Sequence, residues 1–347
     1  MKALVFYGAG EKAWEDKPTP ILDKSTDAIV HIKHTTICGT DLHIMRGSVP
    51  TAHKGVTLGH EGVGIVEELG NNVTNFKIGD KVLISCITSC GKCLNCRKGF
   101  YGHCSDGGWI LGNTINGCQA ERVRIPHADG SLYHVPDHAD EQGFVMLSDI
   151  LSTGLEVGVL DGKVRPGCSV AIVGAGPVGL AALITAQFYA PAQLITIDVD
   201  PNRLEISRSL GATHAVNNQD NTAVEQVMNL TEGQGVDVVI EAIGTPAGWD
   251  LSEAMVAAGG NLAVLGVHGK SVTLHLEHMW KRNFTMTAGL VHTTTIPMLM
   301  KTIISGRLQP RKLISHYMKM SEIIEGYNIF ANAAKHCALK VLMTNDL

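Results

Sequence analysis

The sequence predicts an α/β protein in which an irregular β domain precedes a doubly wound α/β domain with a parallel sheet. Two observations predict this class. Up to about Phe144, short apolar strands alternate with glycine turns, and helical periodicity is sparse. From about Ile150, continuous apolar runs alternate with helical segments, as in strands that are buried on both faces of a parallel sheet. After about Phe284 the pattern is mixed again.

The strands expected in the first region are short and are bounded by glycine, aspartate or other turn residues. They are Met1–Phe6, Ala28–Lys33, Gly64–Gly70 and Lys81–Ile84. The second region alternates apolar runs with two helical segments, at the spacing of βαβ units. The runs are Val170–Val173, Leu194–Ile197, Val236–Ile240 and Asn261–Leu265, and the helices are Leu180–Tyr189 and Pro201–Leu210.

Composition excludes several classes of protein. The 347 residues are 45% hydrophobic and 18% charged, with a formal net charge of −5 and no basic stripe, which argues against a nucleic-acid or membrane partner. The apolar start is too short for a signal peptide, and no window of about 18 apolar residues predicts a membrane span. We therefore expect a cytoplasmic protein. In that setting nine cysteines indicate metal ligation rather than disulfides.

A glycine-rich turn follows the Val170–Val173 strand and opens the next helix. It matches G-x-G-x-x-G through Gly174, Gly176 and Gly179, with Pro177 and Val178 between the last two glycines. In this context the glycines allow a tight turn, close approach of a pyrophosphate and close packing of helix on strand. The helix amino end then presents N–H groups to the phosphates. The alternative is an ordinary glycine-rich turn, but the strand before it and the helix after it favour a dinucleotide site.

Asp198 ends the next apolar run, 19 residues after Gly179. A carboxylate there accepts hydrogen bonds from the adenosine ribose and repels a 2′-phosphate, so it favours NAD over NADP. Arg203 lies close enough in sequence to bind a 2′-phosphate, but with Asp198 before it we expect it to contact the ribose or the adenine. The alternative for Asp198 is a solvated acid at a strand end.

Four cysteines lie within fifteen residues, and the glycines and polar residues between them do not suggest a buried strand. Four thiolates in a compact loop suit a closed, tetrahedral zinc site that stabilises a lobe near residues 86–107. An iron–sulfur cluster is the competing metal, because ferredoxins also space cysteines by two residues. The four candidate ligands are Cys90, Cys93, Cys96 and Cys104.

Two further motifs stand at the ends of predicted strands: Cys38-Gly-Thr-Asp-Leu-His43 and Gly59-His60-Glu61-Gly62. Spacing alone does not bring them together, because a lone cysteine is more often a small buried residue and a lone histidine an ordinary polar one. The remaining cysteines have no ligand spacing and are interpreted as packing residues; they are Cys86, Cys118, Cys168 and Cys337.

In this order, the two motifs, the four-cysteine lobe and the glycine loop resemble the zinc-containing medium-chain alcohol dehydrogenases. The resemblance runs from Met1-Lys2-Ala3 to Ala338-Leu339-Lys340-Val341, which is nearly the whole chain. It implies a GroES-like catalytic domain over residues 1–149, a Rossmann dinucleotide-binding domain over 150–285 and a return to the catalytic domain over 286–347. It also implies an active site in the cleft between the domains.

The resemblance implies a catalytic zinc held by Cys38, His60 and Asp149, in addition to the structural zinc. An aspartate as third ligand is similar to the bacterial secondary-alcohol branch, since many members have a cysteine there. Glu61 matches an acid that can enter the metal shell when water leaves or moves. This ligand set leaves one position open for substrate, as a catalytic zinc requires.

The implied reaction is reversible hydride transfer between an alcohol and NAD, with zinc as the Lewis acid. Thr40 fits the first proton acceptor and also contacts substrate; the alternative is a turn hydroxyl bonded to its own backbone. His43 fits the group that passes the proton to solvent, because its ordinary pKa is near 6.5; otherwise it is a surface histidine.

The nicotinamide end is expected at the carboxyl ends of two apolar runs, where a doubly wound sheet binds its ligand. Lys340 matches a position that touches the pyrophosphate; otherwise it is a solvated lysine. Trp109 matches a wall of the substrate pocket, and packing within the lobe is its alternative. The residues expected at the nicotinamide end are Ala242, Ile243, Leu265, Gly266 and Val267.

Two rival functions remain open from the sequence. A polyol, threonine or aldehyde-oxidising dehydrogenase would use the same zinc and cofactor. A zinc-stabilised nucleotide-binding protein without catalysis would keep both ligands but turn over no alcohol. The expected partner is a small alcohol or ketone, most simply a secondary and apolar one. By analogy we expect a homo-oligomer, namely a tetramer.

Overall fold

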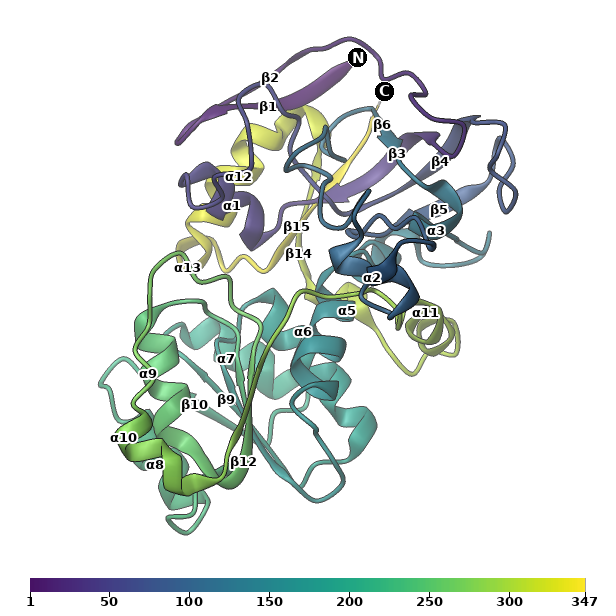
Figure 1. Cartoon of the computed structure of the whole chain (residues 1–347). Coiled ribbons are helices and arrows are strands. Elements are labelled where there is room, and N and C mark those ends of the chain that lie inside the picture. Colours follow the sequence, from purple (N-terminus) through teal and green to yellow (C-terminus); the bar gives the residue numbers. More distant parts are fainter. Residues whose placement is uncertain (347) are drawn as a thin grey trace. The chain divides into compact units, whose positions relative to one another are not determined.

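The computed structural model describes residues 1–346 and divides the chain into two compact units. Unit 1 contains Met1–Ser152 and His292–Leu347, and unit 2 contains Thr153–Val291. Figure 1 traces the chain and labels its helices and strands where there is room. Unit 1 therefore combines the first 152 residues with the carboxyl-terminal segment, and unit 2 is the stretch between them.

Unit 1 is built on a sheet that is antiparallel except for one pair of strands, β14 and β15, which are parallel. The sheet order is β14-β15-β3-β4-β5-β7, with β6 paired to β3, and a separate hairpin joins β1 to β2. The strands are β1 Lys2–Gly8, β2 Glu11–Asp16, β3 Ala28–Thr36, β4 Gly62–Leu69, β5 Lys81–Ile84, β6 Arg122–Ile125, β7 Leu132–His134, β14 Ile314–Lys319 and β15 Lys340–Thr344.

Most helices of unit 1 are a single turn, as the sparse helical periodicity predicts. The helices are α1 Gly39–Met45, α2 Leu94–Arg97, α3 Ala128–Ser131, α4 Glu141–Phe144, α5 Ile150–Thr153, α11 Ile296–Ile304, α12 Ile323–Ala331 and α13 Ala333–His336. The longer helix α12 contributes Ile323, Tyr327 and Phe330 to a core that also contains residues of β1, α1 and β15. The carboxyl-terminal segment is thus part of the core of unit 1.

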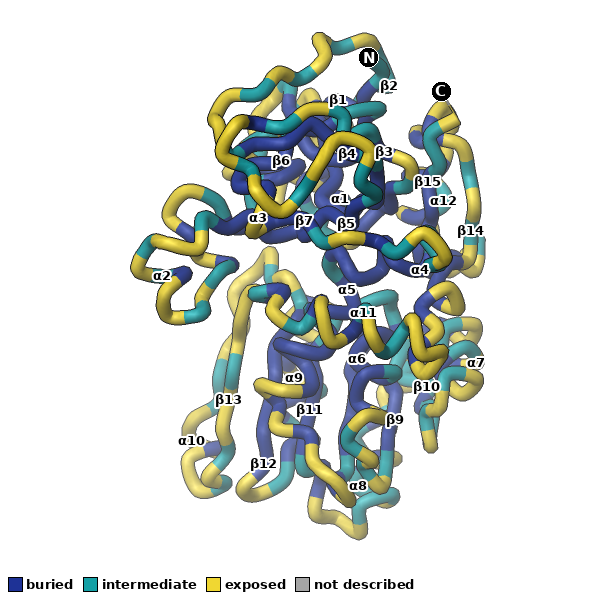
Figure 2. Tube along the Cα trace, turned by 90° about the vertical axis from the view of Figure 1, so that its right-hand side faces the viewer, coloured by how far each residue is buried: buried dark blue, intermediate teal, exposed yellow. Residues whose placement is uncertain are grey.

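Unit 2 carries a parallel sheet, which has six strands among the described residues, in the order β10-β9-β8-β11-β12-β13. Its strands are β8 Ser169–Val173, β9 Gln193–Asp198, β10 His214–Asn217, β11 Val236–Glu241, β12 Val256–Val264 and β13 Thr285–Ala288. The apolar runs predicted from the sequence fall on β8, β9, β11 and β12. Figure 2 shows the inner strands β9, β11 and β12 as mainly buried and the edge strand β13 as largely exposed.

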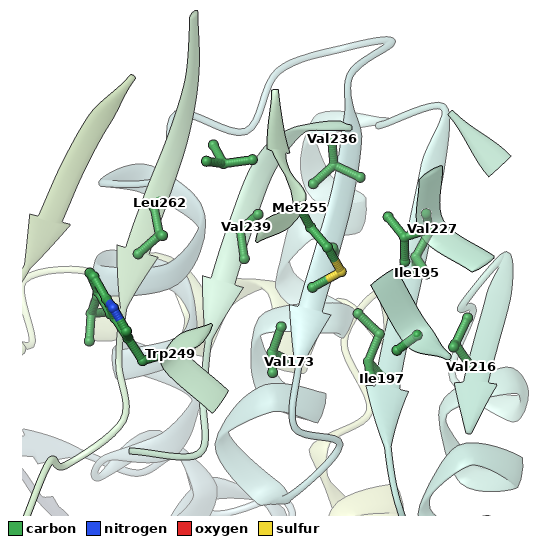
Figure 3. Packing of buried hydrophobic residues seen from close by; sticks show 14 of the residues in the cluster. Val173, Ile195, Ile197, Val216, Val227, Val236, Val239, Trp249, Met255 and Leu262 are labelled. Carbon is green, nitrogen blue, oxygen red and sulfur yellow. The ribbon is translucent and has the colours of Figure 1, made fainter. Parts of the chain in front are cut away.

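Helices cover both faces of this sheet. They are α6 Pro177–Ala186, α7 Pro201–Ser209, α8 Ala223–Leu230, α9 Pro246–Met255 and α10 Leu276–Met279. On one face, Val227 of α8 and Trp249 of α9 join strand residues such as Val173 and Val239 in one apolar cluster (Figure 3). On the other face, α6 packs against a π-helical segment, Gly154–Leu160, so closely that a Cβ on Gly154 would lie 2.6 Å from the Ala182 nitrogen.

The predicted fold class is confirmed: a mainly antiparallel β unit accompanies a doubly wound unit with a parallel sheet. Over the described residues, no single helix is long and apolar enough to cross a membrane. One bent pair of helical segments, Glu141–Leu147 with Ile150–Leu160, meets the length and composition test.

Candidate active site and metal centres

The register of unit 1 assembles a site from distant segments. Strands β3 and β4 are antiparallel, with Thr35 opposite Gly62, so the end of β3 and the start of β4 lie at one edge of the sheet. Cys38 follows β3, and His60 precedes β4. Asp149 reaches the same edge because the neighbouring Ser148 accepts a hydrogen bond from the Gly62 nitrogen through its Oγ atom, at 3.1 Å.

Three side chains converge there: Cys38, His60 and Asp149. Asp149 Oδ2 lies 3.5 Å from Cys38 Sγ and 3.3 Å from His60 Nε2. Metal–ligand bonds of about 2.0–2.3 Å separate the donor atoms of a tetrahedron by about 3.3–3.8 Å. The observed spacings therefore fit one zinc ion between these three donors.

The charges of the three groups also favour a cation. Burial raises the pKa of the Cys38 thiol, so a thiolate at this position requires a nearby positive charge. Burial lowers the pKa of His60, but hydrogen bonds that the ring makes to Asp149 and Cys38 outweigh burial and hold that pKa well above the ordinary value. The cluster attracts positive charge, and a zinc ion can replace the shared proton.

Glu61, next to His60, is fully buried and paired with Lys340. Its Oε2 atom accepts hydrogen bonds from Lys340 Nζ and Thr36 Oγ1. The register explains this meeting, because β15, which starts at Lys340, pairs with β3 beside Thr36. The Glu61 Oε1 atom is buried and has no hydrogen-bond partner among the described residues.

The structure gives Lys340 a different partner from the one that the resemblance implies. Its side chain is 0% exposed, and its Nζ atom donates to Glu61 and to the Ile37 carbonyl oxygen, at 3.3 Å from the latter. An ammonium buried in this way balances the charge of the Glu61 carboxylate. The strand pairing that buries Lys340 is not visible in the local sequence.

Three other predicted residues surround the metal ligands. Thr40 is half-buried on α1, with Oγ1 3.8 Å from Cys38 Sγ. His43 lies one turn later, and burial, followed by the charge of Arg46, lowers its pKa. Trp109 packs its ring edge-on to the His60 ring, with centroids 6.2 Å apart, so an apolar surface lies beside the site.

The four cysteines of the lobe form the second group of metal donors. Cys93 caps α2 by accepting a hydrogen bond from the Cys96 nitrogen, and Cys104 Sγ accepts one from the Cys90 nitrogen at 3.3 Å. Hydrogen bonds from the Cys96 and Ser105 nitrogens lower the pKa of Cys93 to about 5, whereas burial raises that of Cys96 to about 12. N–H groups aimed at sulfur favour thiolates, as a structural zinc site requires.

Unit 2 presents the predicted dinucleotide loop between β8 and α6. Gly174 has φ +102°, and a Cβ there would lie 2.7 Å from Ile243 Cγ1; a Cβ on Gly179 would lie 1.9 Å from the Gly174 carbonyl oxygen. Gly176 caps α6 with Pro177 and Val178 behind it, and no side chain within residues 1–346 caps this helix end. The N–H groups at this helix start can therefore serve an anion.

Asp198 lies beside this loop at the end of β9. Its Oδ2 atom accepts a hydrogen bond from the Ala175 nitrogen at 2.7 Å, and Oδ1 accepts from the Val199 and Asp200 nitrogens. Arg203 stands between the two acids, 4.0 Å from Asp198 and 3.8 Å from Asp200. The acids balance its charge, which weakens its attraction for a 2′-phosphate.

The segments predicted for the nicotinamide end meet at a residue that sequence reasoning missed. Glu241 ends β11 with a fully buried side chain. Its Oε1 atom accepts from the Ile243 and Gly244 nitrogens, at 2.9 and 2.8 Å, and its Oε2 atom lies 3.1 Å from His268 Nε2. A Cβ on Gly266 would lie 2.4 Å from Glu241 Oε2. One carboxylate therefore ties Ala242–Gly244 to Leu265–His268, including Val267.

The interpretation of the spare cysteines as packing residues is wrong for Cys337, which is exposed, and Cys86 has a neighbour that the sequence did not predict. Cys86 is buried, but its thiol lies 3.9 Å from Asp149 Oδ1, because β5 ends beside the start of β4 and carries Cys86 to the metal edge. Cys337 is exposed at the end of α13. Cys118 and Cys168 are buried, as predicted. No spacing signal marks Cys86, since its neighbour Asp149 is 63 residues away.

Comparisons with known proteins agree with this geometry. Residues 24–137 match the alcohol dehydrogenase GroES-like domain, and residues 177–305 match the zinc-binding dehydrogenase domain. Zinc-dependent alcohol dehydrogenase 2 from Streptococcus pneumonia, solved in its apo form, is 53% identical, with a TM-score of 0.96 over 100% of this chain and 99% of that one.

Two further proteins are similar over nearly their whole length. Alcohol dehydrogenase TADH from Thermus sp. ATN1 is 36% identical, with a TM-score of 0.91 over 99% of this chain and 100% of that one. An alcohol dehydrogenase of Cupriavidus necator is 36% identical over 96% of this chain and 95% of its own length.

The chain contains a GroES-like unit, which carries a three-donor and a four-thiol metal site, and a dinucleotide-binding unit. Together these features define a zinc-dependent oxidoreductase. The chain belongs to the zinc-containing medium-chain alcohol dehydrogenase family. The four-thiol site is accordingly a structural zinc site rather than an iron–sulfur site, and the chain is an enzyme rather than a nucleotide-binding protein without catalysis.

Proposed function

We propose that the enzyme interconverts secondary, apolar alcohols and their ketones with NAD, as members of the bacterial secondary-alcohol branch do. One observation carries the proposal: the aspartate Asp149 completes the donor set of Cys38 and His60, with Trp109 packed against the histidine. When bound there, zinc supplies a Lewis acid for the substrate oxygen. With three protein ligands, a tetrahedral zinc keeps its fourth coordination position open for that oxygen.

Thr40 and His43 are proposed to move the proton. Thr40 Oγ1 is 3.8 Å from a zinc-ligand sulfur, so its hydroxyl can take the proton of an alcohol oxygen bound nearby while it passes its own proton on toward His43. His43 lies one helical turn further along α1. Because burial and Arg46 lower its pKa, His43 is neutral at pH 7 and can accept the proton and release it to solvent.

Glu61 is proposed to adjust the coordination of the metal. Lys340 and Thr36 bind its Oε2 atom only, which leaves Oε1 as the oxygen for a metal ion. Its Oε1 atom lacks a hydrogen-bond partner among residues 1–346 and is the atom that can approach an ion held by His60. A buried carboxylate oxygen without a partner is costly, and a cation offsets that cost.

The preference for NAD is proposed on the basis of Asp198. Its carboxylate lies at the carboxyl end of β9 beside the phosphate loop, where the adenosine ribose binds in doubly wound folds. A 2′-phosphate would meet this negative charge, while Arg203 is already engaged by Asp198 and Asp200.

A panel of substrates tests the proposal directly. Initial rates of reduction of NAD and of NADP would be compared for short 2-alkanols, 1-phenylethanol, sorbitol and threonine. We expect the highest kcat/KM with the 2-alkanols and NAD. A strong preference for sorbitol or threonine would overturn the substrate class while leaving the zinc chemistry in place, and a preference for NADP would overturn the role of Asp198.

A cytoplasmic homo-oligomer, a tetramer by analogy, is also proposed. The outermost strand of the unit 2 sheet, β13, is largely exposed, with Met286 at 44%, and Trp280 just before it is 73% exposed. An exposed sheet edge with apolar side chains favours pairing with a second copy. Light scattering coupled to size-exclusion chromatography should give four chains per particle, and a monomer would refute the proposal.

A further inference from the structure

A buried chain of hydrogen bonds runs from helix α12 to Asp41, whose carboxylate faces the zinc-ligand histidine. Tyr327 Oη donates to Gln119 Oε1 at 2.8 Å. Gln119 Nε2 donates to Asp41 Oδ2 at 3.0 Å and to the Thr36 carbonyl oxygen at 3.1 Å. Tyr327 is 2% exposed, and Gln119 and Asp41 are 0% exposed. Water therefore does not replace these partners.

The chemistry of the groups fixes the direction of the chain. Burial, together with the negative charge of Asp41, holds the pKa of Tyr327 well above its ordinary value, so the hydroxyl keeps its proton. The amide oxygen of Gln119 accepts the hydrogen bond from this hydroxyl, which leaves the amide nitrogen to face the carboxylate. The Gln119 amide can therefore satisfy both neighbours in one orientation only.

The end of the chain is a carboxylate oxygen that faces the metal ligand. Asp41 Oδ2 is held by Gln119 and by the Cys38 nitrogen, at 2.9 Å from the latter. Asp41 Oδ1 lies 3.7 Å from His60 Nδ1, too far for a hydrogen bond, and neither atom has a hydrogen-bond partner within the described chain. A histidine that binds metal through one nitrogen usually donates the other N–H to such a carboxylate.

The backbone beside His60 leaves room for this arrangement. Gly59 has φ +93°, and a Cβ there would lie 2.6 Å from Gln119 Cγ and 2.9 Å from its nitrogen. Any side chain at position 59 would displace Gln119 from Asp41. Gln119 can therefore pack against the backbone beside His60 only because residue 59 is glycine.

We propose that Gln119 and Tyr327 are positioning residues that fix Asp41, and through it His60, for zinc binding. The carboxyl-terminal segment, which ends the chain far from any ligand in sequence, thereby sets how firmly the catalytic zinc is held. The inference rests on Cys38, His60 and Asp149 as the ligands of that zinc.

The test measures release of zinc to a chromogenic chelator from the wild-type enzyme and from Tyr327→Phe and Gln119→Glu. The four-thiol zinc in the same molecule provides an internal reference. We expect the catalytic phase to be about threefold to tenfold faster in Y327F and faster still, by about tenfold or more, in Q119E, which places a second carboxylate against Asp41. The lobe phase should be unchanged.

Tyr133→Phe is the matched control, because it removes a tyrosine hydroxyl that donates to the Thr293 carbonyl oxygen in the same unit. It should release both zinc ions at the wild-type rates. The absorption spectrum of the cobalt-substituted catalytic site should shift in Q119E and not in Y133F. Thermal denaturation distinguishes a local change at the metal from general unfolding.

Equal release of catalytic zinc from the wild type, Y327F and Q119E would overturn the inference. A wild-type enzyme that holds only the lobe zinc would instead refute the ligand set on which it rests. Faster release from Y133F as well as Y327F would show that any lost hydroxyl loosens the site, and it too would overturn the specific role of Tyr327.

Discussion

The two metal sites of unit 1 are built in opposite ways. The lobe takes four thiols from one continuous stretch, Cys90–Cys104, and two of them are only partly buried. The catalytic site takes one donor each from Cys38, His60 and Asp149, of which the first two are buried. One site is completed by a local loop, and the other is completed only after the sheet has formed.

The difference lies in what surrounds the donors. In the lobe, backbone N–H groups of the same loop serve the sulfur atoms. At the catalytic site the support comes from side chains far away in sequence, such as Lys340 against Glu61 and Tyr327 behind Gln119. The catalytic site, which must exchange ligands, is therefore held rigid by side chains of the folded core. The structural site is held rigid by the backbone of its own loop.

The largest expected effect is a loss of activity when the catalytic site alone is disrupted. Cys38→Ala should lower kcat/KM for alcohol by about three orders of magnitude or more, because it removes a ligand of the Lewis acid. Zinc content should fall from two to one per chain while the lobe remains intact. Cys118→Ala, at a buried cysteine outside both donor sets, should keep both zinc ions; full turnover by C38A would contradict the ligand set.

The next largest effect concerns the buried ion pair behind the catalytic site. Lys340→Met should lower the free energy of unfolding by about 3–5 kcal/mol, because it leaves the Glu61 carboxylate buried and unpaired. The double variant Glu61→Gln/Lys340→Met should recover much of that loss. Chemical denaturation measures both. If K340M kept its stability and mainly raised KM for NAD, the pyrophosphate contact that the resemblance implies would be favoured instead.

A smaller effect is expected for proton transfer. Thr40→Val should lower kcat by about 10²-fold, since it removes the hydroxyl and keeps the shape of the side chain. Thr40→Ser restores the hydroxyl and should recover most of the rate. Both variants should retain two zinc ions, which steady-state kinetics and metal analysis can check together. Equal rates for T40V and T40S would exclude the hydroxyl from catalysis.

The smallest effect on catalysis is expected in the lobe. Cys93→Ser should release the structural zinc, so proteolytic cleavage within residues 90–104 should become roughly tenfold faster through local opening. Turnover of the remaining catalytic site at 25 °C should stay within about twofold of the wild type, because the lobe supplies none of its donors. Loss of both zinc ions from C93S would show that the two sites depend on one another.

The sequence predicted most where contacts are local. The glycine loop and the four-cysteine lobe follow from spacing and flanking pattern, because each is formed by consecutive residues. Asp149 as a ligand followed only from family resemblance, since nothing near residue 149 marks it. Cys86 and Glu241 could not be predicted, because strand register brings Cys86 to Asp149 and Glu241 to the segment Leu265–His268.

Long-range strand pairing also explains why Lys340 is buried. Its position matches a cofactor contact in the family pattern, but pairing of β15 with β3 buries it against Glu61. Gly59 and Gln119 likewise carry no signal of their own, because their fit appears only when residue 59 lies against residue 119. Long-range register, which a single sequence does not encode in any local window, decides these parts of the site.

The most direct test is anomalous scattering at the zinc edge from crystals of the zinc-loaded enzyme. Two peaks per chain are predicted, one among the four lobe sulfurs and one about 2.0–2.3 Å from Cys38 Sγ, His60 Nε2 and a carboxylate oxygen of Asp149. A loaded enzyme with density in the lobe alone, or with a second zinc bound away from these three atoms, would contradict the account.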